Sequence, residues 1–277
     1  MVFLFSFLSL FITFILIKLI LPFLKKNLID IPNSRSLHFY PTPKGGGIIF
    51  AFVSSFFLFL LKNYIGLISI PLSIVGLIDD KLNLSKQLRY FSQFLSVFII
   101  FLLSNMYPIM INDQKNIIQL LIFIVVLIIG TAIINFTNFM DGIDGLVAGC
   151  MIVWFTTISL CSNQSYFILV ASLLGFLIWN WAPSKIFMGD AGSTYLGLIV
   201  VGTLLNMKSI TFMFNSLLIL SPLYIDAISC IIRRILKKQN IFSAHNLHLY
   251  QRLNKKGISK SKISLIYISN INSLILF

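Results

Sequence analysis

The chain has 277 residues, of which 58% are hydrophobic and only 10% are charged, and its mean hydropathy is +0.96. Soluble domains have about 25% charged residues, so this composition excludes a soluble globular protein and predicts an integral membrane protein. The formal net charge of +13 would also suit a nucleic-acid-binding protein, and the distribution of the basic residues has to decide between the two.

Long apolar segments recur along the whole chain without a linker, so we expect a single all-α transmembrane domain over residues 1–277. The first segment lacks the basic start and the small-residue cleavage site of a signal peptide, and it therefore predicts an anchored helix. We expect a polytopic helical bundle of about ten transmembrane helices, the last one shorter than the roughly 20 residues that a span needs. These helices are predicted near residues 2–24, 46–61, 64–78, 90–111, 117–134, 146–161, 165–181, 193–207, 210–232 and 262–277.

The basic residues lie mostly on one side of this predicted bundle. With the N-terminus outside, 17 of the 21 Lys and Arg residues fall in the inner loops or at the inner start of the last helix, whereas the outer loops hold only Lys62, Lys115 and Lys208. Cytoplasmic loops carry such an excess, so these inner loops are predicted to face the cytoplasm. The positive charge then reflects topology, and we expect contacts with membrane lipids and no nucleic-acid partner.

All eight acidic residues are Asp, and six of them lie on the predicted cytoplasmic side. A carboxylate at membrane depth costs on the order of 3 kcal/mol, so acids in a membrane protein usually mark a site or an ion pathway. Five of the six are in three inner loops, which read GLIDDKLNLS, NFTNFMDGIDGLVAG and IFMGDAGSTYLG. Asp oxygens suit Mg²⁺, which proteins usually bind through one or two carboxylates and the phosphates of a substrate. A metal-bridged pyrophosphate and an ion pathway are therefore both open.

The middle loop has a polar side chain at every third position, namely Asn135, Asn138, Asp141 and Asp144. Neighbours at this spacing share a helix face, but the row drifts by about 60° at each step, so one straight helix cannot present all four to one ligand. The glycines after the two aspartates predict a bent or unwound segment that lets the backbone approach a ligand. A polar connection between helices, with capping Asn and Asp, would have the same pattern.

The other two acidic loops each allow two interpretations. Asp79 and Asp80 could bind a cation, or they could form a solvated helix end with Lys81 as partner. Asp190 precedes a predicted helix in a glycine-rich turn, where it could hold a metal-phosphate group or simply cap the helix.

The first and last inner loops add basic side chains. The last loop contains HNLHLYQRL, and a helix there would put His245, His248 and Arg252 on one face as three potential phosphate donors. The first loop, DIPNSRSLHFYPTPKGGG, combines turn residues with Lys44 and is consistent with contact to a phosphate or a lipid headgroup. A basic belt against anionic lipid and a simple connector are the corresponding alternatives.

Read together and in this order, the five inner loops resemble the polyprenyl-phosphate N-acetylhexosamine-1-phosphate transferase family, which includes the peptidoglycan translocase and the enzymes that initiate O-antigen and teichoic acid synthesis. The motifs that carry the resemblance are DIPNSRSLHFYPTPKGGG, GLIDD, NFTNFMDGIDGL, FMGDAGSTYLG and HLYQRL. The resemblance implies a multi-pass protein of the bacterial inner membrane with its active site facing the cytoplasm. Such a protein would transfer a sugar-1-phosphate from a UDP-N-acetylhexosamine to undecaprenyl phosphate, release UMP, and initiate a cell-envelope glycan such as O-antigen. The implied cofactor is Mg²⁺, with Mn²⁺ as a substitute, and a homodimer is compatible with the family.

Matching positions imply roles for individual residues. Asp79, Asp80 and His248 are implied to be catalytic, with Asp79 as the base or the binder of the acceptor phosphate. Asp190 is the implied Mg²⁺ ligand, together with Asp144. Contacts with the substrates are implied for Lys44, Asn135, Asn138, Asp141, Asp144, His245 and Arg252.

One motif departs from the family pattern. Many members carry a run of His in the last motif, whereas this chain has His248 followed by Leu249, Tyr250 and Gln251. This places the chain nearer the sub-branch that begins O-antigen chains with modified sugars such as N-acetylfucosamine or N-acetylquinovosamine. An ion-coupled transporter is the main alternative, and it predicts acids deep within the helices. A membrane scaffold, the third interpretation, gives no reason for three Asp loops to converge.

Overall fold

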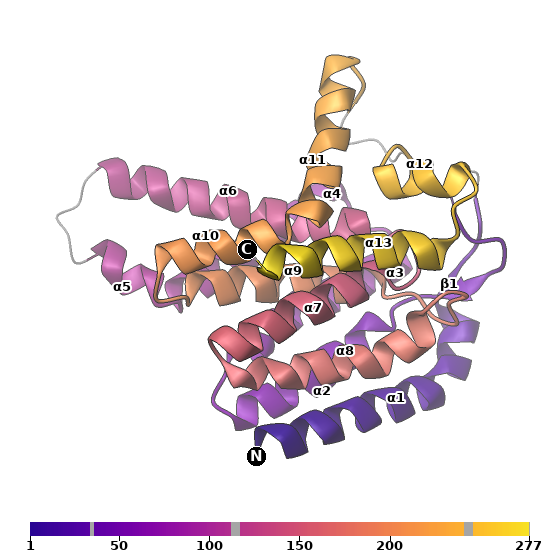
Figure 1. Cartoon of the computed structure of the whole chain (residues 1–277), viewed down its shortest axis with the longest axis horizontal. Coiled ribbons are helices and arrows are strands. Elements are labelled where there is room, and N and C mark those ends of the chain that lie inside the picture. Colours follow the sequence, from indigo (N-terminus) through magenta and orange to yellow (C-terminus); the bar gives the residue numbers. More distant parts are fainter. Residues whose placement is uncertain (34–35, 112–116, 241–245, 277) are drawn as a thin grey trace.

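The computed structural model of the chain describes residues 1–33, 36–111, 117–240 and 246–276, and over these residues it confirms an all-α architecture (Figure 1). A short antiparallel ribbon, with Ile29 opposite Pro43, is the one sheet among them. The elements are α1 (Val2–Asn27), β1 (Ile29–Asp30), β2 (Thr42–Pro43), α2 (Gly47–Leu60), α3 (Ile65–Leu82), α4 (Lys86–Leu102), α5 (Met106–Ile111), α6 (Ile117–Met140), α7 (Leu146–Cys161), α8 (Phe167–Asn180), α9 (Gly189–Leu205), α10 (Ile210–Ile219), α11 (Ser221–Leu236), α12 (Leu249–Lys255) and α13 (Lys260–Ser273), with 3₁₀ turns at Gln164–Tyr166 and Leu274–Leu276.

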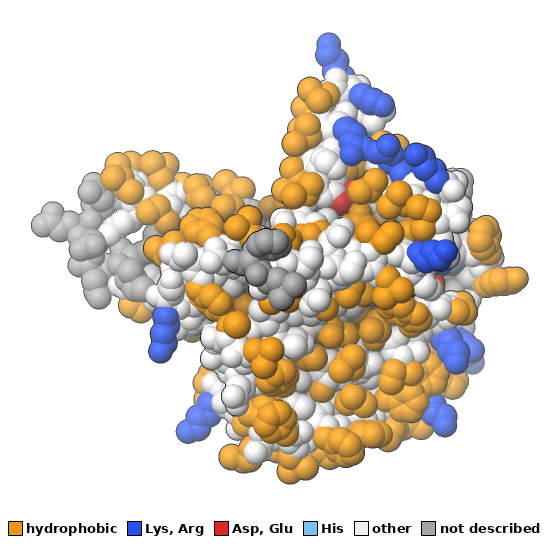
Figure 2. All heavy atoms as spheres, in the orientation of Figure 1, with side chains coloured by type: hydrophobic (Ala, Val, Ile, Leu, Met, Phe, Trp, Pro, Cys, Tyr) orange, Lys and Arg blue, Asp and Glu red, His pale blue; other side chains and the backbone are white. Residues whose placement is uncertain are grey.

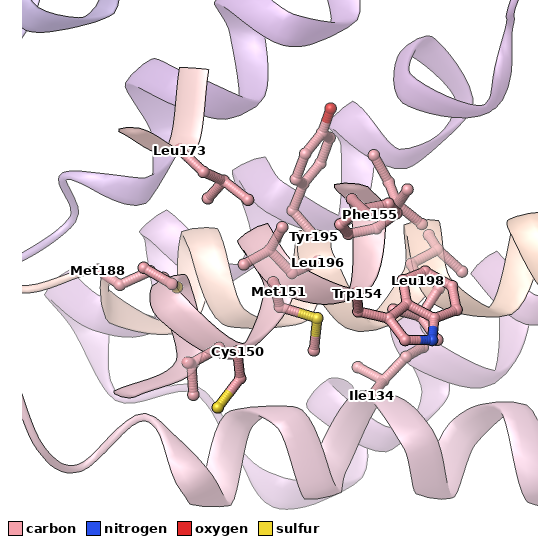
Figure 3. Close-up of a cluster of buried hydrophobic side chains, with 14 of the residues drawn as sticks. Ile134, Cys150, Met151, Trp154, Phe155, Leu173, Met188, Tyr195, Leu196 and Leu198 are labelled. Carbon is pink, nitrogen blue, oxygen red and sulfur yellow. The ribbon is translucent and has the colours of Figure 1, made fainter. Parts of the chain in front are cut away.

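Helix α9 lies at the centre of the bundle. Every residue of α9 from Ala191 to Leu205 is buried, and the helix packs against α2, α3, α4 and α6. A helix that is apolar all round has to be surrounded by other helices, which is the arrangement seen. Figure 3 shows Tyr195, Leu196 and Leu198 of α9 within a cluster of buried side chains that includes Trp154 and Phe155. This packing gives the start of α9 a fixed place at one edge of the bundle.

Two described helices, α1 and α6, are by themselves long and apolar enough to cross a membrane. Helices α10 and α11 together make a third such segment, bent by 72° at the break between them. Helices α2, α7, α8 and α9 are apolar but shorter, with 14 to 17 residues each, so a bundle of about ten spans stays a prediction.

The helix ends that carry predicted site residues differ from the prediction in three helices, and two helices predicted as continuous are divided. Helix α3 continues to Leu82, α6 continues to Met140, and α9 begins at Gly189, so the polar residues at these ends belong to helices and not to loops. The hydropathy pattern predicted helices that were too short, because polar residues that are hydrogen-bonded within the fold lower the hydropathy at helix ends. The helices predicted over 90–111 and 210–232 are each divided in two, into α4 and α5 and into α10 and α11.

The predicted inner connections gather at one edge of the molecule. In Figure 1 the ribbon, the end of α3, α12 and the start of α13 all lie at the right-hand edge. Lys and Arg side chains stand over α11 and α12 and along this same edge in Figure 2, whereas the surface of α1, α7 and α8 between the two ends is largely apolar. Exposed Phe3, Phe7 and Phe11 on α1 match a surface that faces lipid.

Candidate active site

The first inner loop is hydrogen-bonded to the segment before α9. The Gly46 and Gly47 amides donate to the carbonyls of Phe187 (3.0 Å) and Met188 (2.9 Å), and the Phe187 amide donates to the Pro43 carbonyl (2.8 Å). Gly47 lies so close to α9 that a Cβ there would be 2.2 Å from the Cα of Gly192. This contact explains the glycine run in the loop, and it brings Lys44 to the start of α9.

Three carboxylates meet where α3 ends and α9 begins. Lys44 Nζ is 3.7 Å from Asp80 Oδ1, and the Ala191 amide donates to Asp80 Oδ2 at 3.4 Å. Arg89 of α4 reaches both remaining acids, because its Nη1 is 3.1 Å from Asp79 Oδ2 and 3.8 Å from Asp190 Oδ2. The three predicted acids are therefore side by side, with one cation on each flank.

Asp79 also holds the short connection between α3 and α4. Its Oδ1 accepts the Leu84 amide at 2.7 Å, Asn83 ends α3 in the left-handed conformation (φ 51°), and the Ser85 hydroxyl accepts the Leu88 amide at the start of α4. The connection sets the distance between Asp79 and Arg89. Both carboxylate oxygens of Asp79 thus have hydrogen-bond donors.

Burial and neighbouring negative charge raise the pKa values of three carboxyls here, those of Asp80, Asp190 and the nearby Asp141. Burial raises the pKa of Asp80 to about 6, and Lys44 offsets part of that effect. Burial and the nearby charge of Asp80 raise the pKa of Asp190 to about 7. Burial, followed by the charges of Asp190 and Asp80, raises the pKa of Asp141 well above its ordinary value. Near neutral pH the Asp190 carboxyl is therefore only partly ionised, and a cation beside it would favour the ionised form.

The polar side chains near the end of α6 contact two different helices, α9 and α4. Asn138 donates through Nδ2 to Asp190 Oδ1 and to Ser193 Oγ, both at 2.9 Å, and so joins α6 to the acid cluster. Asn135, one turn earlier, donates to Gln93 Oε1 of α4 at 2.6 Å. The chain then bends, and Gly145 has a positive φ of 75° at the start of α7. The predicted bend after the two aspartates is confirmed, and it separates Asn135 from Asp141 and Asp144.

Asp144 has a partner that its position in the sequence does not suggest. Lys260, at the start of α13, donates to Asp144 Oδ1 at 3.0 Å and Oδ2 at 3.1 Å. The Ser184 amide also donates to Oδ2 at 3.2 Å, and the side chain of Asp144 is 4% exposed. Asp144 therefore holds a lysine in place, whereas Asp80 and Asp190 lie beside each other at the start of α9.

The last inner loop contributes His248 but not the predicted three-residue face. His248 precedes α12 as its N-cap, so it is not within the helix, and it is almost completely buried. Arg252, one turn into α12, lines a separate basic pocket with Arg233, Arg234 and Lys237. His245 lies outside the described residues.

Two pockets open at this edge and share a wall. The α4 pocket, of about 360 Å³, is lined by Leu72, Val75, Gly76, Asp79, Lys86, Arg89, Tyr90, Ser92, Gln93, Asn135, Asn138, Phe139, Asp190, Thr194, His248, Tyr250 and Gln251. The loop pocket, of about 400 Å³, is lined by Asp30, Asn33, Ser36, Leu37, His38, Lys44, Asp80, Asn138, Asp141, Gly142, Ile143, Asp144, Asn180, Phe187, Met188, Gly189, Asp190, Gln251 and Lys260. Asn138, Asp190 and Gln251 line both. Every predicted site residue in the described part of the chain except Arg252 lines one of them.

The carboxylates alone are too few to hold a divalent cation, but they could hold one together with the phosphate oxygens of a substrate. Among the described residues no group of three or more His, Cys, Asp and Glu side chains is arranged to hold a metal ion. Asp80 and Asp190 are adjacent hard oxygen donors with raised pKa values, which is the setting in which a cation relieves repulsion. Mg²⁺ is commonly bound through two carboxylates plus phosphate oxygens, so the pair suits that mode.

Four further residues line one or both pockets and were not predicted as site residues, namely Arg89, Gln93, Gln251 and Lys260. Arg89 and Gln93 share one face of α4, a helix with clear separation of polar and apolar faces, and that amphipathic pattern was a usable signal. No comparable signal marks Lys260, since its role depends on a contact with a residue 116 positions away.

Comparison with known proteins gives one family. The model of the family described as Glycosyl transferase family 4 matches residues 62–208. The chain is 29% identical to a probable undecaprenyl-phosphate N-acetylglucosaminyl 1-phosphate transferase of Bacillus subtilis, over 88% of this chain and 75% of that protein. It is 28% identical to an undecaprenyl-phosphate alpha-N-acetylglucosaminyl 1-phosphate transferase of Thermotoga maritima, over 93% and 84%. It is 26% identical to a phospho-N-acetylmuramoyl-pentapeptide-transferase of Staphylococcus haemolyticus, over 93% and 92%.

Proposed function

Since this chain belongs to glycosyl transferase family 4, the polyprenyl-phosphate N-acetylhexosamine-1-phosphate transferases, we propose that it moves an N-acetylhexosamine-1-phosphate from a UDP-sugar to undecaprenyl phosphate and releases UMP. The observation that carries the proposal is the pair of pockets that meet at Asn138, Asp190 and Gln251. A transfer between two phosphates requires two anionic ligands to reach one point, and the shared wall is such a point.

The α4 pocket suits the lipid acceptor. One part of its lining is apolar, with Leu72, Val75 and Phe139, and another part carries Arg89 and His248. An isoprenoid phosphate has the same division, with an apolar chain and an anionic head. Arg89 can bind the phosphate through its guanidinium, a fork-shaped donor that matches phosphate oxygens.

The loop pocket suits the nucleotide sugar. Its lining is drawn from polar loops and includes Lys44, His38 and Lys260, which can contact the diphosphate. The carboxylates of Asp141 and Asp144 supply hydrogen-bond acceptors for the uracil, ribose or sugar hydroxyls, whereas the Asn180 amide is already bonded to Gly145 and Ile186. The identity of the sugar depends on these contacts, and a modified N-acetylhexosamine remains the proposed donor.

In the proposed reaction an oxygen of the lipid phosphate attacks the phosphorus that bears the sugar. A new oxygen–phosphorus bond forms, the bond from that phosphorus to UMP breaks, and UMP leaves with the electron pair. Both oxygens of Asp79 are engaged by Leu84 and Arg89, which favours a role in holding Arg89 and the acceptor over attack by Asp79 itself. Because the acceptor is already an anionic oxygen nucleophile, alignment and charge neutralisation are the main requirements.

We propose Mg²⁺, with Mn²⁺ as a substitute, as the cofactor held by Asp190 and Asp80 with phosphate oxygens. Bound there, the cation would neutralise charge on the transferred phosphoryl group. Lys44 and Arg89 flank the acids and would carry the remaining negative charge of the two substrates.

The proposed setting is the inner membrane of a bacterium, with about ten spans and with both pockets on the cytoplasmic side, where UDP-sugars are made. The proposed product would initiate a cell-envelope glycan such as O-antigen. No contact in the described part of the chain favours a transporter or a scaffold, because the paired acids lie at helix ends and converge on one edge.

The test is UMP release by purified protein with undecaprenyl phosphate, Mg²⁺ and a panel of UDP-N-acetylhexosamines. We expect release that requires the lipid and the metal, and a loss of at least about 100-fold in Asp190→Asn, which keeps the size of the side chain but removes its charge. Release that does not need the lipid, or an Asp190→Asn enzyme with wild-type turnover, would contradict the proposal.

A further inference from the structure

Helix α11 contains one carboxylate, Asp226, and buries it. The residue is 3% exposed and has Leu223, Tyr224, Ala227 and Cys230 as buried neighbours on the same helix. A buried carboxylate is costly unless several donors reach it, so its partners indicate why it is there.

The partners of Asp226 come from the two elements that follow in the chain. The amides of Leu249 and Tyr250, at the start of α12, donate to Oδ1 at 2.7 Å and to Oδ2 at 3.3 Å. The Tyr267 hydroxyl of α13 donates to Oδ2 at 2.7 Å. One side chain of α11 therefore joins α11, α12 and α13.

Asp226 also faces the imidazole of His248. The Nδ1 atom of His248 is 3.7 Å from Asp226 Oδ1, and the ring lies parallel to that of Tyr250, with centroids 5.5 Å apart. Tyr250 is itself held by its hydroxyl, which donates to the Phe139 carbonyl at the end of α6. With Nδ1 toward α11, Nε2 is on the opposite side of the ring. His248 lines the α4 pocket, so Nε2 is the nitrogen available to a ligand there.

We propose that Asp226 is a positioning residue for the transfer reaction: its carboxylate holds the start of α12 and directs Nδ1 of His248 toward α11, so that Nε2 faces a phosphate in the α4 pocket and donates to it when the ring carries both protons. The inference rests on the proposed function and adds to it a residue outside both pockets. A carboxylate behind Nδ1 fixes the ring orientation, keeps a proton on Nδ1 and stabilises the doubly protonated ring, and partners of this kind commonly matter as much as the group that they support.

The test compares two variants, each of which removes one interaction made by the carboxylate of Asp226. Asp226→Asn keeps the size of the side chain but removes the charge that faces His248, and we expect kcat for UMP release to fall about 10- to 100-fold with less than about a threefold change in KM for the UDP-sugar. Tyr267→Phe removes one hydrogen bond to Asp226 without touching His248, and we expect kcat within about threefold of wild type. Equal losses in both variants would show that Asp226 only stabilises the packing of α11 to α13, and would overturn the proposal.

A double-mutant cycle with His248→Gln separates positioning from general stability. If Asp226 acts through His248, adding Asp226→Asn to His248→Gln produces no further loss of kcat. Independent, multiplicative losses would refute the proposal, as would wild-type kcat in Asp226→Asn. If Asp226→Asn does not fold, as judged by its melting temperature, Asp226→Glu keeps the charge but displaces it, and wild-type kcat in that variant would equally refute the proposal. Failure of the wild-type protein to release UMP would instead count against the proposed function.

Discussion

Lys260 is the residue whose contact adds most to the predicted site. Its ammonium group is bonded to both oxygens of Asp144 and lines the loop pocket, so it joins α13 to the connection between α6 and α7. A lysine held in this way can contact the diphosphate of a nucleotide sugar without losing side-chain freedom on binding.

We expect Lys260→Met to raise KM for the UDP-sugar about tenfold with a change in kcat below about threefold, because the contact is with the donor and Asp144 loses its partner. The matched control is Lys262→Met, which removes the same charge from an exposed position two residues later. Initial rates of UMP release against donor concentration measure both constants. An unchanged KM in Lys260→Met, or an equal rise in Lys262→Met, would count against a donor contact.

The raised pKa values of Asp80 and Asp190 predict how stability depends on pH. These carboxyls ionise at about 6 and about 7 in the folded protein but near 3.8 when unfolded, so the folded protein binds more protons between these values. Stability without metal must therefore fall as pH rises from about 4 to about 7, and it should level off above that range.

We expect the melting temperature in chelator to decrease from pH 5 to pH 7.5, and added Mg²⁺ to reverse the decrease, because the metal binds the ionised form. Thermal unfolding in detergent measures this, with Asp190→Asn as the control that removes one of the two titrating groups. A melting temperature in chelator that does not change with pH would contradict the assignment.

The connection between α3 and α4 is the element on which the acid cluster depends. Asn83 is in the left-handed conformation, and the Leu84 amide that follows is bonded to Asp79. Three residues thus set the position of Arg89 relative to Asp79, and the length of the connection leaves little room for adjustment.

We expect Asn83→Gly to keep wild-type stability and activity, since glycine adopts φ 51° without steric cost. Asn83→Val should cost about 1–2 kcal/mol, because a β-branched residue is strained there, and kcat should fall as Arg89 shifts. Thermal unfolding and UMP release on the two variants give both quantities. Equal behaviour of the Gly and Val variants would show that the turn conformation does not matter.

The whole molecule presents the α4 pocket and the loop pocket at one edge, and the charge distribution predicts that this edge faces the cytoplasm. Lys256, between α12 and α13, and Lys62, after α2, are both exposed and lie at opposite predicted sides. Cys161 is exposed, whereas Cys150 and Cys230 are buried, so a background of Cys161→Ser suits labelling.

We expect Lys62→Cys to react with a membrane-impermeant maleimide in intact cells. Lys256→Cys should react only after the membrane is opened, because its side of the protein faces the cytoplasm. The Cys161→Ser protein without an added cysteine is the control. Labelling in the reverse order would place the pockets outside and would be incompatible with a cytoplasmic UDP-sugar as donor.

Local sequence patterns were sufficient for the class of fold, for most of the helices and for the segments that line the two pockets. Apolar segments predict helices, basic residues predict the inner side, and each acidic motif is contained within a dozen residues or so. The bend after Asp141 was predicted from two glycines for the same reason, because backbone freedom is a local property.

Tertiary structure alone decided which of these residues act together. Asp144 meets Lys260 across 116 positions, and Asp226 meets Tyr267 across 41, through the packing of α13 beside α7 and α11. The helical end of α6 sends Asn135 to α4 and Asn138 to α9, although both belong to one motif. Hydropathy and spacing describe each segment separately, whereas these pairings depend on how helices pack around α9, so only the folded chain could decide them.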